Sequence, residues 1–196
     1  MERETLLLDR LLQERALVEY KLVLNLSREI RLQLDEEKAY GLTTYGKAIQ
    51  WFTQPMITVA GFCARRDMEE TLLRWMHRIC AQVERFELTC NNYGSLPGYP
   101  LFIRLADDGP VRRLGEQFRS LDGWLRSNGT GGVTVPAPRL QLVHSMEDSR
   151  SLEVLLDYSA RTFASRGLVE EVLLVGQGQQ IVSRLPLAMR LNFINE

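Results

Sequence analysis

Two short stretches of this chain share one design and carry side chains that could take part in chemistry. One reads QPMITVAGF and the other reads PAPRLQLVH, and in each a proline is followed by alternating side chains of two kinds. In a β-strand, residues two apart point to the same side. Met56 and Thr58 are therefore expected to project together from the first strand, and Arg139 and Gln141 from the second. The pattern predicts two strands of the same role, each of which presents one pair of side chains.

Histidine is the side chain whose ordinary pKa best suits proton transfer near neutral pH, and the chain contains only two. His144 follows Arg139 by five positions, so regular strand alternation predicts that it points to the opposite face. His77 lies on the helix predicted after the first strand, where a structural role is expected. Because the two histidines lie on different predicted elements, a histidine-rich metal site is not expected.

The elements that must position the two strands follow from hydrophobic periodicity. Strands are expected over residues 19–27, 55–62, 85–93, 100–106 and 138–144, with two more over residues 168–189. Helices are expected over residues 28–39, 67–84, 110–126 and 149–165, with Ser27 and Asp67 as caps and loops at 40–47 and 127–138. The order predicts an α+β fold of two pseudo-symmetric lobes, one from each half of the chain. Each lobe is expected to be a small antiparallel-rich sheet with two helices, and a groove separates them.

The N-terminal residues 1–18 are predicted to be a helical extension of a single bilobal domain over residues 19–196. Leucines recur at helical spacing within residues 4–18, with charged residues between them. This helix is expected either to pack on the domain as an accessory element or to form a homodimer contact.

The composition is that of an ordinary globular protein and excludes several classes of function. The 196 residues carry a formal net charge of −1, so no global attraction to nucleic acid or membrane is expected. No stretch has the uninterrupted apolar core of a signal peptide or approaches the roughly 20 apolar residues of a membrane span. The three cysteines lack C-x-x-C spacing, which favours a reducing, cytoplasmic location without disulfides, metal or cofactor.

The paired strands and their surroundings resemble the 2H phosphoesterase superfamily, also called the 2′,5′-RNA ligase-like family. In that family two His-x-Thr/Ser-x motifs lie on two inner strands that are far apart in the sequence. The resemblance covers nearly all of residues 19–187 and includes the stretch YGSLPGYPLFIRL. The residues that carry it around the two motifs are Pro55, Ile57, Thr58, Val59, Phe62, Pro138, Leu140 and Leu142. The resemblance implies a bilobal fold in which both motifs face one groove.

The resemblance also implies a metal-free mechanism, which this sequence departs from. In the family one motif histidine acts as general base, the other acts as general acid, and the hydroxyl groups hold phosphate oxygens. Here Met56 and Arg139 stand at the histidine positions and Gln141 replaces the second hydroxyl, so only Thr58 is retained. Methionine has no titratable proton, and arginine stays protonated at physiological pH. Because general acid–base catalysis is worth about 10²–10⁴-fold per group, we expect a degenerate member with no catalytic residues, that is, a pseudoenzyme.

At a position that contacts phosphate in the family, Arg139 could hold a phosphate through two hydrogen bonds. Thr58, Gln141, Ser95 and Tyr99 could add neutral hydrogen bonds, which predicts a pocket for a phosphorylated nucleotide or an RNA end.

Three alternatives stay open. Arg139 could be solvated or paired with a carboxylate while Met56 fills space. The protein could be an active phosphodiesterase, including a 2′,3′-cyclic phosphodiesterase, that uses non-standard residues such as His144. It could also be a scaffold or dimerisation protein whose N-terminal leucines carry the function.

Overall fold

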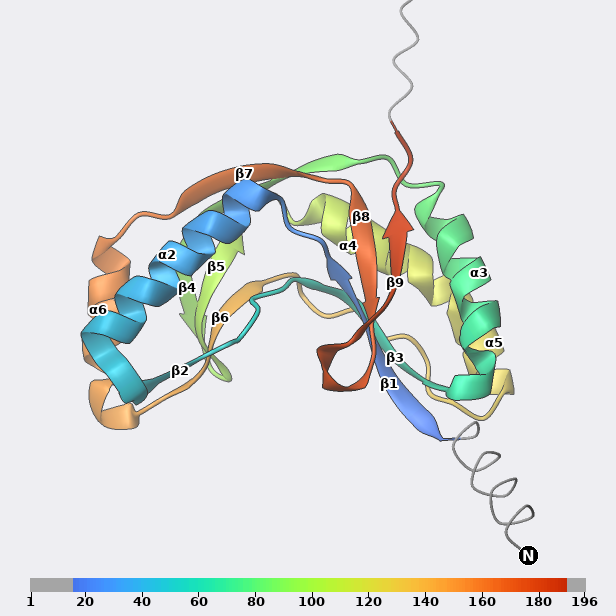
Figure 1. The fold of residues 1–196 in the computed structure, drawn as a ribbon, viewed down its shortest axis with the longest axis horizontal. Coiled ribbons are helices and arrows are strands. Elements are labelled where there is room, and N and C mark those ends of the chain that lie inside the picture. Colours follow the sequence, from blue (N-terminus) through green and yellow to red (C-terminus); the bar gives the residue numbers. More distant parts are fainter. Residues whose placement is uncertain (1–15, 190–196) are drawn as a thin grey trace, which may run out of the picture.

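Two antiparallel sheets, each packed against helices, build the two lobes of the protein, which lie side by side in Figure 1. The structure is a computed structural model that describes residues 16–189. All strand pairs within the two sheets are antiparallel. The predicted α+β class, with two lobes that each combine one sheet and helices, is confirmed.

The first lobe is a four-stranded sheet in the order β3-β1-β8-β9. Its strands are β1 (Leu17–Leu24), β3 (Thr58–Arg65), β8 (Glu171–Val175) and β9 (Ile181–Pro186). Its helices are α3 (Glu69–Cys80), α4 (Gly109–Phe118) and the short α5 (Asp122–Ser127). Helix α3 contacts β9 and α4 contacts β3, so both helices cover this sheet. Along β1 the burial alternates, with Tyr20 and Leu22 in the core and Glu19 and Lys21 exposed.

The second lobe is a five-stranded sheet in the order β2-β6-β5-β4-β7. Its strands are β2 (Ile49–Trp51), β4 (Phe86–Leu96), β5 (Tyr99–Leu105), β6 (Leu140–Met146) and β7 (Ala164–Val169). Its helices are α2 (Arg28–Tyr45) and α6 (Asp148–Ala160), which contact β7 and β4 respectively. One cluster of buried apolar side chains includes residues of both sheets, so the lobes share a core. Within the described residues, no helix is long and apolar enough to cross a membrane.

The lobes are not consecutive halves of the chain, contrary to the prediction. After β1 the chain enters the second lobe for α2 and β2, and returns to the first for β3 and α3. It then builds β4 and β5 in the second lobe, α4 and α5 in the first, and β6, α6 and β7 in the second. The last two strands, β8 and β9, complete the first sheet. The hydrophobic pattern indicates which segments are strands. It does not determine which strands pair, because most of the paired strands lie far apart in the sequence.

Helix α2 begins at the predicted cap and continues past its predicted end. The Ser27 hydroxyl accepts a hydrogen bond from the Ile30 backbone N–H at 3.4 Å, which confirms the cap. The helix continues to Tyr45, so the predicted loop at 40–47 is wrong. Gly41 lies inside the helix, and the Trp51 indole packs directly on it. A Cβ added at this position would lie 1.9 Å from a carbon of the indole ring. This glycine therefore permits a close contact and does not end the helix.

Several other predicted boundaries are corrected. Strand β1 begins at Leu17, so residues 17 and 18 are not helical. The rest of the predicted N-terminal helix, with its homodimer contact, lies outside the described residues. Asp67 does not cap α3, because the N-cap position is Met68 and no side chain caps this helix. The Asp67 carboxylate accepts a hydrogen bond from the Arg65 Nε at 3.1 Å instead. The predicted helix over 149–165 ends at Ala160, and β7, which the sequence did not reveal, begins four residues later.

The segment 127–138 is irregular, as predicted, but it is not a free surface loop. Thr130 and Val133 are buried, and the Thr130 hydroxyl donates a hydrogen bond to the Leu125 carbonyl at 2.8 Å. Thr134 and Gly61 exchange two backbone hydrogen bonds of 2.8 Å each, which ties the segment to β3.

A buried ion pair joins α2 to the end of α6 in the second lobe. Arg161 donates two hydrogen bonds to the Glu37 carboxylate, at 3.1 and 3.2 Å, and its guanidinium lies 3.7 Å from the centre of the Tyr40 ring. The exposed fraction of the side chain is 10% for Glu37 and 30% for Arg161. Close by, Asp157 accepts hydrogen bonds from the hydroxyls of Tyr40 and Tyr45 at 2.9 Å. Burial and this carboxylate raise the pKa of Tyr45 to about 12.

Candidate functional site

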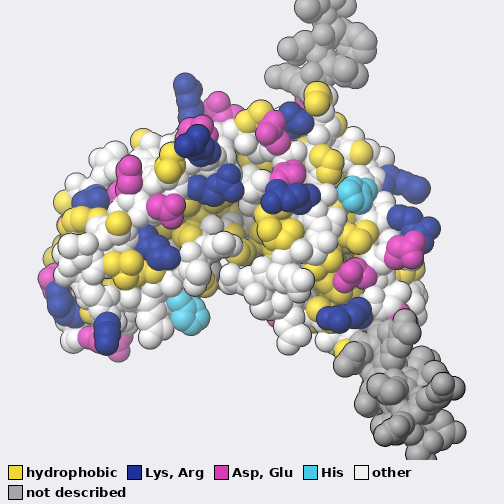
Figure 2. Space-filling view, viewed as in Figure 1, with side chains coloured by type: hydrophobic (Ala, Val, Ile, Leu, Met, Phe, Trp, Pro, Cys, Tyr) yellow, Lys and Arg dark blue, Asp and Glu magenta, His cyan; other side chains and the backbone are white. Residues whose placement is uncertain are grey.

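A groove of about 1000 Å³ opens between the two lobes, where the space-filling view shows a hollow (Figure 2). Its first wall comes from β1, from β3 and from the β8–β9 loop over residues 176–179. Its second wall comes from the segments that precede β3 and β6 and from the start of β5. A volume of this size suits a ligand of nucleotide size or larger.

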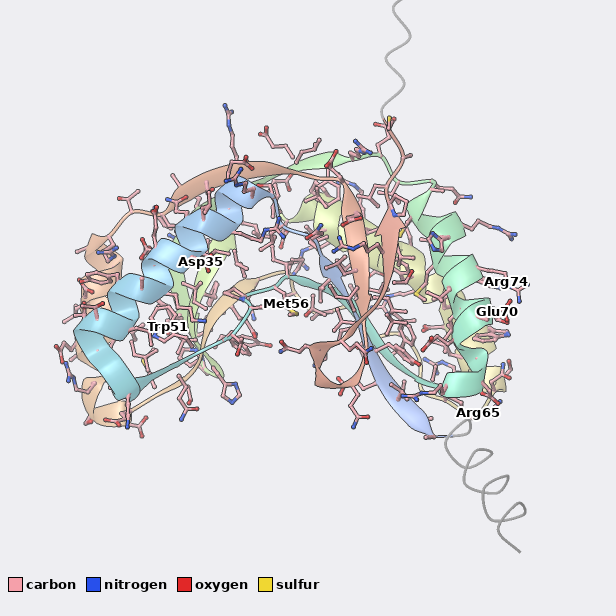
Figure 3. All side chains as sticks on the ribbon, viewed as in Figure 1. Asp35, Trp51, Met56, Arg65, Glu70 and Arg74 are labelled. Carbon is pink, nitrogen blue, oxygen red and sulfur yellow. The ribbon has the colours of Figure 1, made fainter. Side chains whose placement is uncertain are left out.

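The four motif positions all line this groove. Met56 and Arg139 each lie just before their strand, because β3 begins at Thr58 and β6 begins at Leu140. Both strands thus start later than predicted, but the alternation holds. Ile57, Leu140 and Leu142 are fully buried. Since these residues alternate with the motif side chains, the motif side chains face outward into the groove. Figure 3 labels Met56 at the centre of the molecule, where the lobes meet.

Backbone hydrogen bonds hold the two motif segments in place. The Leu24 N–H donates to the Ile57 carbonyl at 3.0 Å, which extends the pairing of β1 to the residue before the start of β3. The Phe52 N–H donates to the Leu142 carbonyl at 3.0 Å, which brings the first motif segment beside β6. One short segment, residues 52–57, therefore bridges the two sheets and carries Met56 across the junction.

The Arg139 guanidinium is oriented by aromatic rings. It lies 4.6 Å from the centre of the Tyr99 ring and 5.4 Å from that of Phe102. Such contacts stabilise a cation by about 0.5–2 kcal/mol without neutralising it. Among the described residues, none forms an ion pair or a hydrogen bond with this guanidinium. Its N–H donors therefore remain free for a ligand, and the pairing with a carboxylate that the sequence left open is not formed here.

Two groove residues on β1 were missed by the sequence reasoning. Lys21 and Glu19 line the first wall and form an ion pair of 3.3 Å, with more than half of each side chain exposed. The sequence contains a pattern that could have identified them. Both are charged residues that alternate with the buried Tyr20 and Leu22 on an otherwise apolar strand, so they had to face away from the core. With Arg139 on the facing wall, the described lining holds two cations and one carboxylate. The excess of positive charge favours an anionic ligand.

The remaining predicted site residues divide into two groups. Tyr99 lines the groove, whereas Ser95 is exposed on β4 and is not part of the lining. His144 is exposed on β6, where its ring lies edge-to-face against Phe52 at 5.4 Å. His77 is exposed on α3. Both histidines lie within the described residues, and neither lines the groove.

The arrangement is suited to holding an anion and poorly suited to moving a proton. The groove wall offers a guanidinium, an ammonium and the side chains of Thr58 and Gln141 as hydrogen-bond donors. Arginine cannot act as a base at physiological pH, and methionine has no proton to transfer. Within residues 16–189, no group of three His, Cys, Asp or Glu side chains is placed to hold a metal ion.

No family model matches the sequence, and no curated protein matches it at the level of sequence. Solved structures do match the fold. LigT of E. coli, crystallised with 3′-AMP, is similar with a TM-score of 0.65 and 17% identity over 88% of this chain and 99% of its own. TT0787 of Thermus thermophilus has a TM-score of 0.62 and 15% identity over 88% and 99% of the two chains. A structure described as a phosphoesterase has a TM-score of 0.62 and 18% identity over 87% and 99%.

These likenesses span both lobes and nearly the whole of each solved chain. At identities of 15–18% they establish the fold and leave the chemistry to the residues of this groove. The chain therefore has the two-lobed fold of the 2H phosphoesterases, as its paired motif strands indicate.

Proposed function

We propose that this protein binds a phosphorylated nucleotide or an RNA end in the groove between its lobes and does not turn it over. The observation that carries the proposal is the state of Arg139. Its guanidinium faces the groove, is held by Tyr99 and Phe102, and has no partner among the described residues. Guanidinium groups form strong paired hydrogen bonds with phosphate oxygens. An arginine kept oriented but unneutralised in this way is a ready phosphate ligand.

The solved structures support the ligand class. LigT of E. coli has been crystallised with 3′-AMP, NADP+ and ATP, which are all phosphorylated nucleotides. In this chain the phosphate would lie between Arg139 and Lys21, with Thr58 and Gln141 as neutral donors. The rings of Phe52 and Tyr99 would offer apolar surface to a sugar or base.

The absence of turnover follows from the side chains at the motif positions. Transfer of a proton to or from a phosphate ester at neutral pH needs a group that titrates in that range. Met56 and Arg139 do not supply one, and both histidines point elsewhere. Binding therefore persists in this proposal while general acid–base catalysis is lost. We place this binding function in a reducing compartment such as the cytoplasm, since Cys63, Cys80 and Cys90 are free thiols.

The test is a thermal-shift titration with adenosine 2′-monophosphate, 3′-monophosphate and 2′,3′-cyclic monophosphate, with adenosine as the ligand without phosphate. Wild type is compared with Arg139→Ala and with Arg78→Ala, which removes an exposed positive charge from α3, away from the groove. A ligand at 100 times its dissociation constant stabilises the folded state by about 2.7 kcal/mol. This corresponds to a rise in melting temperature of roughly 5–10 °C for a protein of this size.

We expect the rise for the phosphorylated ligands, with little for adenosine. Since hydrogen bonds to a charged group contribute about 1.5–3 kcal/mol, Arg139→Ala should lower the affinity about 10- to 100-fold and Arg78→Ala should leave it unchanged. Equal losses in both variants, or no binding of any phosphorylated ligand, would contradict the proposal. Chromatography of the same samples checks for opening of the cyclic phosphate. Its hydrolysis would show turnover by other residues and would overturn the non-catalytic half of the proposal.

A further inference from the structure

A second cavity lies beside the groove, between helix α2 and the strands β8 and β9. Its volume is about 400 Å³, which is within the range of small-ligand pockets. Most of its floor is aliphatic, and the apolar side chains that line it are Val23, Leu24, Leu26, Leu34, Pro55, Met56, Leu173, Val175 and Ile181. Figure 2 shows apolar side chains gathered in the hollow between the lobes. The cavity therefore offers apolar packing to a ligand group.

The second cavity is continuous with the groove, because the same four residues line both. These residues are Gln54, Met56, Val175 and Gln179. Met56 stands between α2 and β8 in Figure 3, and its side chain is only partly buried. Methionine is unbranched and flexible, so it can move aside without strain. A histidine has fewer rotatable bonds than this methionine. The substitution that removes the acid–base group thus also leaves an adaptable passage between the two spaces.

The polar rim of the second cavity has a free hydrogen-bond acceptor. Asp35, on α2, lines the cavity, and within the described part of the chain its carboxylate has no ion pair or hydrogen bond. Figure 3 places Asp35 on α2, near Met56. Two arginines line the same cavity, and both are engaged: Arg31 donates to the Asn25 side chain at 3.3 Å, and Arg184 pairs with Glu171. The Asp35 carboxylate is therefore available to accept hydrogen bonds from amino groups of a ligand.

A flat group with apolar faces and amino donors at its edge fits these features, and a nucleobase such as adenine is such a group. We infer that the ligand is a dinucleotide or a longer strand, with its phosphate in the groove at Arg139 and a neighbouring nucleoside in the second cavity. This inference rests on the proposed function, since it assumes that the groove holds the phosphate. It adds that the mononucleotide is an incomplete ligand.

The test compares adenosine 3′-monophosphate with the dinucleotide ApAp, which carries the same terminal 3′-phosphate, by isothermal titration calorimetry at 0.15 M salt. The variant is Ile181→Glu, which places a carboxylate in the second cavity and leaves the lining of the groove intact. The control is Leu168→Glu on β7, which lines neither space. The two side chains are matched, because Ile181 is 47% exposed and Leu168 is 48% exposed. Both variants carry the same added charge, and neither disturbs the core.

On the wild type we expect ApAp to bind at least about 10-fold more tightly than the mononucleotide, the gain from burying roughly 60 Å² of apolar surface of the base. In Ile181→Glu this advantage should disappear while the mononucleotide affinity is kept. In Leu168→Glu both affinities should match the wild type. Equal affinities of ApAp and the mononucleotide on the wild type would overturn the inference and leave the proposed function standing. An advantage that survives Ile181→Glu would also overturn it. Binding of neither ligand would refute both.

Discussion

Replacing Arg161 by methionine should destabilise the protein far more than the same change at Arg150. Methionine keeps much of the apolar stem of Arg161 and removes the charge. It leaves the Glu37 carboxylate, of which only 10% is exposed, without the two hydrogen bonds of 3.1 and 3.2 Å that satisfy it. Removing one partner of a buried ion pair costs about 3–5 kcal/mol, because the remaining charge stays buried. Since Arg161 itself is 30% exposed, we expect the lower end, about 3 kcal/mol.

Arg150 is the matched control within the same lobe. It too donates two hydrogen bonds to a glutamate, Glu153, and lies over a tyrosine ring, that of Tyr45 at 5.7 Å. The difference is burial, because the Arg150 and Glu153 side chains are 41% and 58% exposed. Water and salt screen such a pair, so Arg150→Met should leave the stability close to that of the wild type.

Urea denaturation followed by circular dichroism measures both variants, and thermal melts give a second reading. A loss of about 3 kcal/mol corresponds to a fall in melting temperature of roughly 6–12 °C for a chain of this size. The double variant Glu37→Leu with Arg161→Met should recover most of the loss, because no unpaired charge then remains. Similar small losses for Arg161→Met and Arg150→Met would refute the reasoning, as would a double variant no more stable than Arg161→Met.

Three further outcomes can be measured with the same protein. Lys21→Ala should weaken nucleotide binding less than Arg139→Ala in the thermal-shift titration, because Lys21 is already paired with Glu19 and largely exposed. A thiol reagent at pH 8, followed by peptide mass spectrometry, should label Cys63 in the groove first, and bound nucleotide should slow this labelling. The buried Cys80 and Cys90 should stay unlabelled, since burial raises the pKa of each thiol to about 12. The unfolded chain then loses these protons from about pH 8.5, whereas the folded chain keeps them to about pH 12. The free energy of unfolding should therefore fall as the pH rises through that window, by up to about 1.4 kcal/mol per pH unit for each thiol. Denaturant titrations from pH 7 to 10 that show no such fall would refute this prediction.

The part of the site that could be predicted from sequence is the part that strand alternation determines. Met56, Thr58, Arg139 and Gln141 share the groove because buried residues alternate with them, even though both strands start later than predicted. The contact between Arg139 and Tyr99 could not be predicted in the same way, because it joins a segment before β6 to the start of β5 across the sheet. Its geometry depends on the register between two strands, which no local pattern specifies.

The errors in the predicted elements have similar causes. A loop was predicted at 40–47, but the helix continues through Gly41, which permits the close approach of Trp51, a residue of another element. Strand β7 was missed because its pairing with β4, and not its composition, makes it a strand. The division of the chain into two sequential halves was wrong for the same reason. In each case, contacts between residues far apart in the sequence determine the local structure, and the local sequence pattern does not reveal them.

The interleaved course of the chain has a consequence for synthesis on the ribosome. Strand β1 lies between β3 and β8 in the first sheet, so one of its edges stays unpaired until β8, about 150 residues later, has been made. The β8–β9 loop also supplies part of the groove wall. A nascent chain that lacks these strands can neither close its first sheet nor bind a ligand in the groove. Folding of the first lobe and ligand binding are therefore both delayed until β8 and β9 have been synthesised, and the first lobe cannot be obtained as a short contiguous fragment.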